Sequence, residues 1–188
     1  MIFKKSFKVN QLVLQSIKKE LQTALNTYSH PFRYFTCGTI ASKTPKQRTV
    51  VLRAIEGDFK LIFYTDKRSA KVEQLRNNST ISALFYHPEK KIQLLFTGNA
   101  TIVTETKELQ KIWTQLSDKA KKDYTTKKAP GSTITPTDGI DYLSDRNFFC
   151  QVEIETTTLE YLKLTDSQHQ RIEFTKQNDG WESQFLVP

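Results

Sequence analysis

The stretch Phe63–Asn78, "FYTDKRSAKVEQLRNN", begins with the composition of a β-strand and ends with that of an α-helix. Ser69 stands where the N-cap of that helix is expected, and a helix N-terminus offers free N–H groups and partial positive charge. With Lys71 inside the first turn and Arg68 before the cap, this corner predicts an anion-binding site. An ordinary capped helix with surface lysines would show the same pattern. The whole corner is polar: Thr65, Asp66, Lys67, Arg68, Ser69 and Lys71.

The segment before it, "RTVVLR" (Arg48–Arg53), has the composition of a strand. Alternate residues of a strand share a face, so Arg48 lies with Val50 and Leu52. Such a face could hold a flat apolar ring, with Arg48 at a charged tail of the ligand. The alternative is an arginine that extends from the rim of a barrel into solvent.

A tight turn at Glu56–Asp58 predicts that "FKLIFYT" (Phe59–Thr65) folds back antiparallel on "RTVVLRAIE" (Arg48–Glu56). This hairpin would bring the arginine strand beside the polar corner. A third feature is Gln93, an amide on an otherwise apolar run. A buried amide without partners costs about 1–3 kcal/mol, so a neighbouring backbone or the polar edge of a heteroaromatic ring is expected beside it.

The rest of the pattern predicts an α+β fold, mainly antiparallel β, with six or seven strands forming a small barrel and helices at its periphery. Gly98 interrupts a long strand and predicts a bend or bulge. Residues 119–139 are polar, rich in proline and glycine, and predict a loop. The expected organisation is one domain, 1–188, with an N-terminal helix 10–27, a barrel core 31–104, a helical and loop insert 105–145 and closing strands 147–188.

Composition excludes several classes of protein and site. No run approaches the ~18 apolar residues of a membrane span, and nothing resembles a signal peptide. Cys37 and Cys150 are far apart, which favours reduced thiols and a cytoplasmic location. The common dinucleotide, P-loop and zinc-protease motifs are missing, and three dispersed histidines make a metal site unexpected.

The net charge of +8 is unevenly distributed along the chain. Residues 138–188 hold 4 Lys/Arg and 10 Asp/Glu, whereas residues 1–137 hold 24 and 10. A basic body suggests an anionic partner, such as a phosphate-bearing small molecule, a nucleic acid or the acidic C-terminal part itself.

Three segments in order and spacing resemble the FMN-binding core of the pyridoxamine 5′-phosphate oxidase-like flavoproteins. They are "RTVVLR", "FYTDKRSAKVEQLRNN" and "ALFYHPEKKIQLLFTGNA", and the resemblance runs from about Pro31 to Ala100. The later "IWTQL", "KKDY", "APG" and "HQRIEF" are consistent with it. The chain looks most like the short oxidase-related branch of the family.

The resemblance implies a split β-barrel homodimer with FMN at the subunit interface. The first strand would line the flavin, Tyr64 and Thr65 would contact it, and Gln93 would meet the polar edge of the ring. The phosphate would be held by Arg68, Ser69 and Lys71. Arg171 of the partner subunit would approach the ring where reduction builds negative charge. The implied cofactor-binding set is Arg48, Thr49, Val50, Val51, Leu52, Arg53, Tyr64, Thr65, Arg68, Ser69, Lys71, Gln93 and Arg171, and the substrate-side candidates are Arg53, Trp113, His169 and Arg171.

Three departures separate the chain from the vitamin B6 oxidases. Ala70 stands where those enzymes usually carry an arginine, Leu162 where they carry a tryptophan, and Ser167 where they carry a further arginine. FMN binding is therefore expected more firmly than pyridoxamine phosphate oxidation. The leading hypothesis is an FMN-dependent oxidoreductase that acts on an unassigned small molecule through flavin N5, with no catalytic side chain identified. The alternatives are a non-catalytic flavin-binding or sensor module and a nucleic-acid binder.

Overall fold

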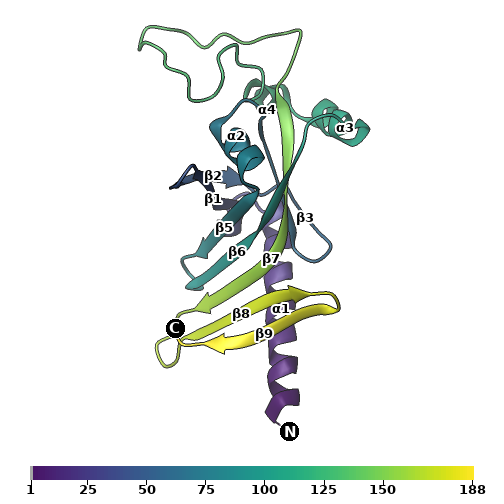
Figure 1. Cartoon of the computed structure of the whole chain (residues 1–188), viewed down its shortest axis with the longest axis vertical. Coiled ribbons are helices and arrows are strands. Elements are labelled where there is room, and N and C mark those ends of the chain that lie inside the picture. The colour runs from purple at the N-terminus through teal and green to yellow at the C-terminus, as the bar shows by residue number, and fades with distance from the viewer. Residues whose placement is uncertain (1) are drawn as a thin grey trace.

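One antiparallel sheet organises the computed structural model, which describes residues 2–188, with side chains from Asn10 onward (Figure 1). Its nine strands within this range are β1 Tyr34–Ala41, β2 Thr44–Val51, β3 Ala54–Glu56, β4 Lys60–Asp66, β5 Thr80–His87, β6 Ile92–Val103, β7 Phe149–Lys163, β8 Gln170–Gln177 and β9 Gly180–Leu186. The helices are α1 Ile2–Asn26, α2 Ala70–Asn77, α3 Lys107–Gln115, α4 Asp118–Lys122 and the 3-10 helix η1 Pro31–Arg33. The predicted class, α+β with mainly antiparallel strands, is confirmed.

The strand order is β2-β1-β5-β6-β7-β4-β3, and the β8–β9 hairpin branches from β7. The first half of β7 pairs with β4 and its second half pairs with β8, while β6 pairs along the other edge of β7. Figure 1 shows α2 and the long loop before β7 at one end of the molecule, and the β8–β9 hairpin toward the other. The two ends therefore carry different parts of the expected cofactor site.

The expected pairing of "FKLIFYT" with the whole of "RTVVLRAIE" was wrong in its first half. That run breaks at Leu52 and Arg53 into two strands: β2 pairs with β1, and only β3 pairs with β4. The Leu52 N–H donates to Arg33 O (2.9 Å), whereas the next N–H, of Arg53, donates to Ile62 O (2.8 Å). The backbone thus changes its hydrogen-bonding neighbour between two consecutive residues.

Two predicted boundaries and the predicted number of strands also need correction. The N-terminal helix begins at Ile2 rather than Asn10, since the intervening residues include neither proline nor glycine to stop it. The expected loop begins later than residue 119, because α4 continues to Lys122 with Ser117 as its N-cap. The number of strands is nine within residues 2–188, not six or seven. No helix in that range has the length and apolar character that a bilayer crossing requires.

Aromatic side chains dominate the core enclosed by the sheet and α1. Phe85 lies 4.9 Å from Phe35 and 5.6 Å from Phe96, measured between ring centroids. Helix α1 contributes the fully buried Leu21 and Ala24, as its apolar periodicity predicted. A smaller cluster, Leu109, Tyr124 and Phe149, packs beneath α3 beside the long loop.

Candidate functional site

The corner between β4 and α2 gathers polar side chains without using them to cap the helix. Ser69 occupies the N-cap position, as predicted, but its side chain makes no capping hydrogen bond. Instead, Lys71 Nζ donates to Thr65 Oγ1 (2.9 Å) and to Ser69 Oγ (3.3 Å). Thr65 and Ser69 are both buried. The corner therefore holds an ammonium group and two hydroxyls around a single point.

Arg48 reaches the same end of the sheet from β2. Its guanidinium donates to Thr39 Oγ1 (2.5 Å) on β1 and to Gln74 Oε1 (3.0 Å) on α2. Thr39 Oγ1 donates in turn to the same Gln74 oxygen (2.6 Å). Neutral partners on two elements thus orient Arg48. Sequence reasoning missed Thr39 and Gln74, and only the position of Gln74 one turn beyond Lys71 could have indicated it.

Among the described side chains, two of the cations at this corner have no carboxylate partner, because the nearby Asp66 is paired with Arg68. Within residues 10–188, neither Arg48 nor Lys71 forms an ion pair with a carboxylate. Burial, and then the nearby charge of Arg48, lower the pKa of Lys71 below its ordinary value. Two cations partly removed from water next to each other are unfavourable unless an anion joins them.

A cavity of about 290 Å³ adjoins this corner. Its lining includes much of the expected cofactor set, together with four residues that the sequence did not single out for the cofactor: Asp66, Asp123, Tyr124 and Pro130. The expected residues that line it are Thr49, Val50, Val51, Arg53, Tyr64, Thr65 and Lys71. Leu52 differs from them, because its side chain is 2% exposed and packs in the core.

Arg68 binds other groups of the protein and does not point into an open anion site. Its guanidinium forms a bidentate pair with Asp66 (3.0 and 2.6 Å) and donates to the carbonyl oxygens of Thr126 (2.8 Å) and Lys127 (3.2 Å). It also lies 3.2 Å from the centroid of the Phe148 ring. Since these contacts occupy its donors, we leave Arg68 out of the phosphate site proposed below.

Gln93 and Arg171 lie toward the other end of the sheet, in one row with Leu162. Gln93 on β6 pairs with Leu162 on β7, which pairs with Arg171 on β8. Arg171 donates to Glu160 (2.9 Å), so its charge is partly neutralised within the same chain. His169, exposed beside this row, accepts a hydrogen bond from the Thr165 N–H through Nδ1 (3.2 Å). His169 and Arg171 line a second cavity of about 740 Å³.

Trp113 lies behind the first cavity rather than on its surface. Its ring packs 5.7 Å from Phe149 and 6.4 Å from Tyr124, between centroids, and Tyr124 itself lines the cavity. Arg53 lies over the Tyr64 ring at 5.6 Å. Burial raises the pKa of Tyr124, and the charge of Arg53 opposes that rise. Of the substrate-side candidates, only Arg53 reaches this cavity directly.

A family model described as the FMN-binding domain of pyridoxamine 5′-phosphate oxidase matches residues 14–104. Residues 14–104 are thus similar to the FMN-binding domain of that family. The segment includes β1 to β6 and α2, and so contains both Arg48 and the polar corner. The resemblance inferred from the three sequence segments is therefore confirmed, and FMN is the cofactor of this domain. No curated protein matches the chain.

Several solved structures share the fold. A pyridoxamine 5′-phosphate oxidase-related FMN-binding protein from Nostoc punctiforme PCC 73102 is 23% identical, with a TM-score of 0.73, over 93% of this chain and 96% of its own. PhzG from Burkholderia lata 383, solved with tetrahydrophenazine-1-carboxylic acid, is 19% identical, with a TM-score of 0.71, over 93% and 91%. General Stress Protein 26 from Bacillus anthracis str. Sterne is 17% identical, with a TM-score of 0.51, over 81% and 96%. At these identities the likeness concerns the split-barrel fold.

The residues of this FMN-binding domain suit the cofactor of the family. FMN joins a flat ring to a phosphate that carries up to two negative charges, and charge-assisted hydrogen bonds to such a group are the strong ones. Lys71 and Arg48 provide the cations, and Thr65 and Ser69 provide hydroxyls at the same point. Val50 and Val51 give the adjoining cavity apolar walls. The FMN phosphate would balance the positive charge of Arg48 and Lys71.

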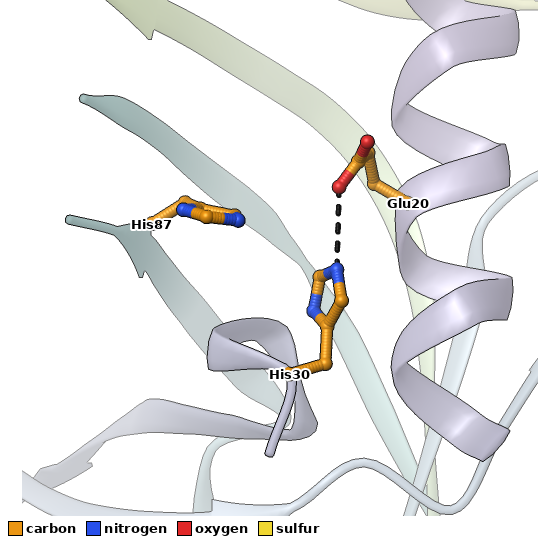
Figure 2. A group of neighbouring side chains, drawn as sticks. All are labelled: Glu20, His30 and His87. Atoms are coloured by element: carbon orange, nitrogen blue, oxygen red, sulfur yellow. Dashed lines mark hydrogen bonds and ion pairs between the residues drawn. The ribbon is translucent and has the colours of Figure 1, made fainter. Parts of the chain in front are cut away.

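A separate polar cluster, Glu20, His30 and His87, joins α1 to the barrel (Figure 2). Its ligand-type atoms lie within 4.8 Å of one another. Both imidazoles, however, accept a backbone N–H at Nδ1, from Phe32 (3.1 Å) and from Lys90 (3.3 Å). A neutral ring that accepts at Nδ1 carries its proton on Nε2, so neither Nε2 offers a lone pair to a metal. Glu20 meanwhile binds Lys90 Nζ (2.6 Å) and His30 Nε2 (3.2 Å). The cluster is a hydrogen-bonded network that fastens α1.

We expect His87 to make the stability of the fold depend on pH. Burial, followed by the charges of Lys90 and His30, lowers the pKa of His87 from 6.5. The unfolded chain then binds more protons, so this contribution is complete above about pH 6.5 and is lost as the pH falls through the folded-state pKa. The melting temperature of wild type should fall between pH 7.5 and 5. His87→Asn, which keeps an acceptor for the Lys90 N–H, should flatten that slope, and equal slopes would contradict the assignment.

Proposed function

We propose that this protein is an FMN-dependent oxidoreductase that acts on a small molecule. The observation that carries the proposal is the pair of cations, Arg48 and Lys71, that converge beside the cavity without a carboxylate partner among residues 10–188. In this proposal Arg48, Thr65, Ser69 and Lys71 hold the phosphate. Residues of β2, with Tyr64, line the ring, and their side chains keep water from one of its faces.

We further propose that the complete site forms between two copies of the chain. Strand β8, which carries Arg171 and whose row includes Gln93, lies toward the opposite end of the sheet from α2, which carries Lys71 (Figure 1). In this proposal a second copy of the chain lets both groups meet one flavin. Arg171 of the partner subunit would then bring positive charge to the ring, moderated by its own Glu160. A fixed cation there favours the anionic reduced form. Buried, unpaired Cys37 and Cys150 suit a reducing compartment, so we propose a cytoplasmic location.

When bound, FMN supplies hydride transfer at N5. The side chains around the cavity serve mainly to bind and to orient, because its lining contains no histidine and its two carboxylates are Asp66 and Asp123. Asp66 is already paired with Arg68. Arg53 is the cavity cation left for a substrate, since no carboxylate within residues 10–188 pairs with it. A small, flat, anionic molecule is the substrate class that this arrangement favours.

The direct test is the visible spectrum of the freshly purified protein, with mass spectrometry of what heat releases. We expect a yellow protein that releases FMN and bleaches with dithionite. A colourless protein that takes up no FMN in a titration would remove the proposal. Size-exclusion chromatography with light scattering tests the dimer independently.

A non-catalytic flavin-binding or sensor module is the second candidate, because the same shortage of acid–base groups in the cavity suits binding without turnover. Reoxidation of the reduced flavin, assayed with amines, nicotinamide donors and flat aromatic carboxylates, separates the two. Turnover with any of them excludes a binding-only role. Single-strand binding with a steep salt dependence would instead favour the nucleic-acid alternative.

A further inference from the structure

The Asp66–Arg68 pair connects two parts of the chain that are remote in sequence. Arg68 donates to the carbonyls of Thr126 and Lys127, 58 and 59 residues away, while holding Asp66 in a bidentate pair. The Asp66 side chain is 2% exposed and that of Arg68 is 21% exposed, so water competes weakly for these bonds. Such a shielded, forked pair fixes both position and direction.

The loop that Arg68 holds is also closed at its base by backbone bonds. Thr126 and Tyr142 form an isolated bridge, and Leu143 N–H donates to Thr125 O (2.7 Å). Phe148 N–H donates to Tyr124 O (2.8 Å), and the Lys67 N–H donates to Phe148 O (2.7 Å). These bonds close the base of the segment, and the last of them joins its end, Phe148, to the β4–α2 corner. Arg68 adds a second link to that corner, nearer the middle of the segment, at Thr126 and Lys127.

This segment forms one side of the flavin cavity. Asp123, Tyr124 and Pro130 line the cavity, and they flank the two carbonyls that Arg68 holds. The opposite side comes from β2 and β4. The separation between the two sides thus depends on where Arg68 places the loop.

We propose that Arg68 and Asp66 are positioning residues that hold residues 123–130 as the outer wall of the flavin cavity. Arg68 therefore acts through the loop and not on the phosphate. The proposal rests on the proposed function for the identity of the ligand, but the fastening of the loop does not need the ligand. The wall faces the side on which Arg53 lies, so it also limits which substrates enter.

The first experiment measures the loop in the protein without FMN. Trypsin cleavage after Lys127 and Lys128, followed by mass spectrometry, reports its opening. Removing charge-assisted bonds worth about 1.5–3 kcal/mol should speed cleavage about tenfold or more in Arg68→Met. Arg76→Met, an exposed arginine on α2, is the matched control and should leave the rate unchanged. Unchanged cleavage in Arg68→Met overturns the proposal.

The second experiment compares FMN with riboflavin, which lacks the phosphate. A displaced wall weakens both ligands by the same factor and exposes the flavin to iodide quenching. If Arg68 instead bound the phosphate directly, Arg68→Met would weaken the binding of FMN and not that of riboflavin. That result also overturns the proposal. If wild type binds neither flavin, the proposed function fails, while the trypsin result still decides the role of Arg68.

A second variant guards against global unfolding. Arg68→Met leaves Asp66 as a buried carboxylate without its cation, which can destabilise the whole domain. The double variant Asp66→Asn/Arg68→Met removes that charge. In wild type the backbone N–H of residue 68 donates to Asp66 Oδ1 (2.8 Å), and the amide oxygen of the Asp66→Asn side chain can still accept this bond. We expect this double variant to keep a cooperative melt and still show rapid loop cleavage. A cooperative melt with a protected loop counts against the proposal.

Discussion

Arg48→Met/Lys71→Met should lower the affinity for FMN by about 10²–10⁴-fold while leaving the affinity for riboflavin within about threefold of wild type. Each side chain would lose charge-assisted hydrogen bonds to the phosphate, and riboflavin has no phosphate to lose them from. Fluorescence titration of both flavins against the protein without cofactor measures the two constants. Equal losses for both flavins would show that the cations contact the ring, or that the cavity has collapsed.

Lys67→Met/Arg76→Met is the matched control for this experiment. It removes the same net charge close to the same corner, but Lys67 faces Glu105 at 4.0 Å and Arg76 is exposed. A general electrostatic effect would weaken FMN binding in both double variants. A specific phosphate site would weaken it only when Arg48 and Lys71 are changed.

Arg48→Met/Lys71→Met should not destabilise the protein without cofactor. The lowered pKa of Lys71 means that the folded state disfavours its charge, first through burial and then through Arg48. Removing one such cation relieves repulsion that only a bound anion would offset. Stability given up for binding in this way is common at functional sites.

Gly98→Ala should lower the free energy of unfolding by about 3 kcal/mol, the largest effect on stability that we expect from a single methyl group. A Cβ at this position would collide with the backbone carbonyl oxygen of Glu155 and come within 3.0 Å of Thr156 Cα. Both neighbours belong to β7, the strand that joins the two ends of the sheet, so neither can withdraw as a side chain could. Urea denaturation followed by circular dichroism measures the change.

Gly139→Ala provides the control, because a Cβ there meets nothing within 4 Å. Its unfolding free energy should stay within about 0.5 kcal/mol of wild type. A Gly98→Ala variant as stable as this control would mean that β6 and β7 can separate at the bulge. The register shift between Thr97 and Gly98 would then be a soft feature of the sheet.

The amino-acid sequence determined the elements and the chemistry of the corner. Strand-like composition located most of the strands, though not the break between β2 and β3, the strand-to-helix corner located α2, and Gly98 marked the irregularity in β6. The order of polar residues after β4 indicated an anion site, because helix N-termini and nearby cations act over a few residues. These features are local, so a linear pattern contains them.

Only the tertiary structure decided which partner each charged side chain takes. Arg68 and Lys71 are three residues apart and look alike as phosphate ligands, yet Arg68 turns to Asp66 and to a loop almost sixty residues later. Lys71 stays with two hydroxyls. The split between β2 and β3 has the same origin, since the Leu52 N–H donates to Arg33 of η1 and the Arg53 N–H donates to Ile62 of β4. Such choices depend on which remote groups packing brings within hydrogen-bond distance, and no local periodicity records that.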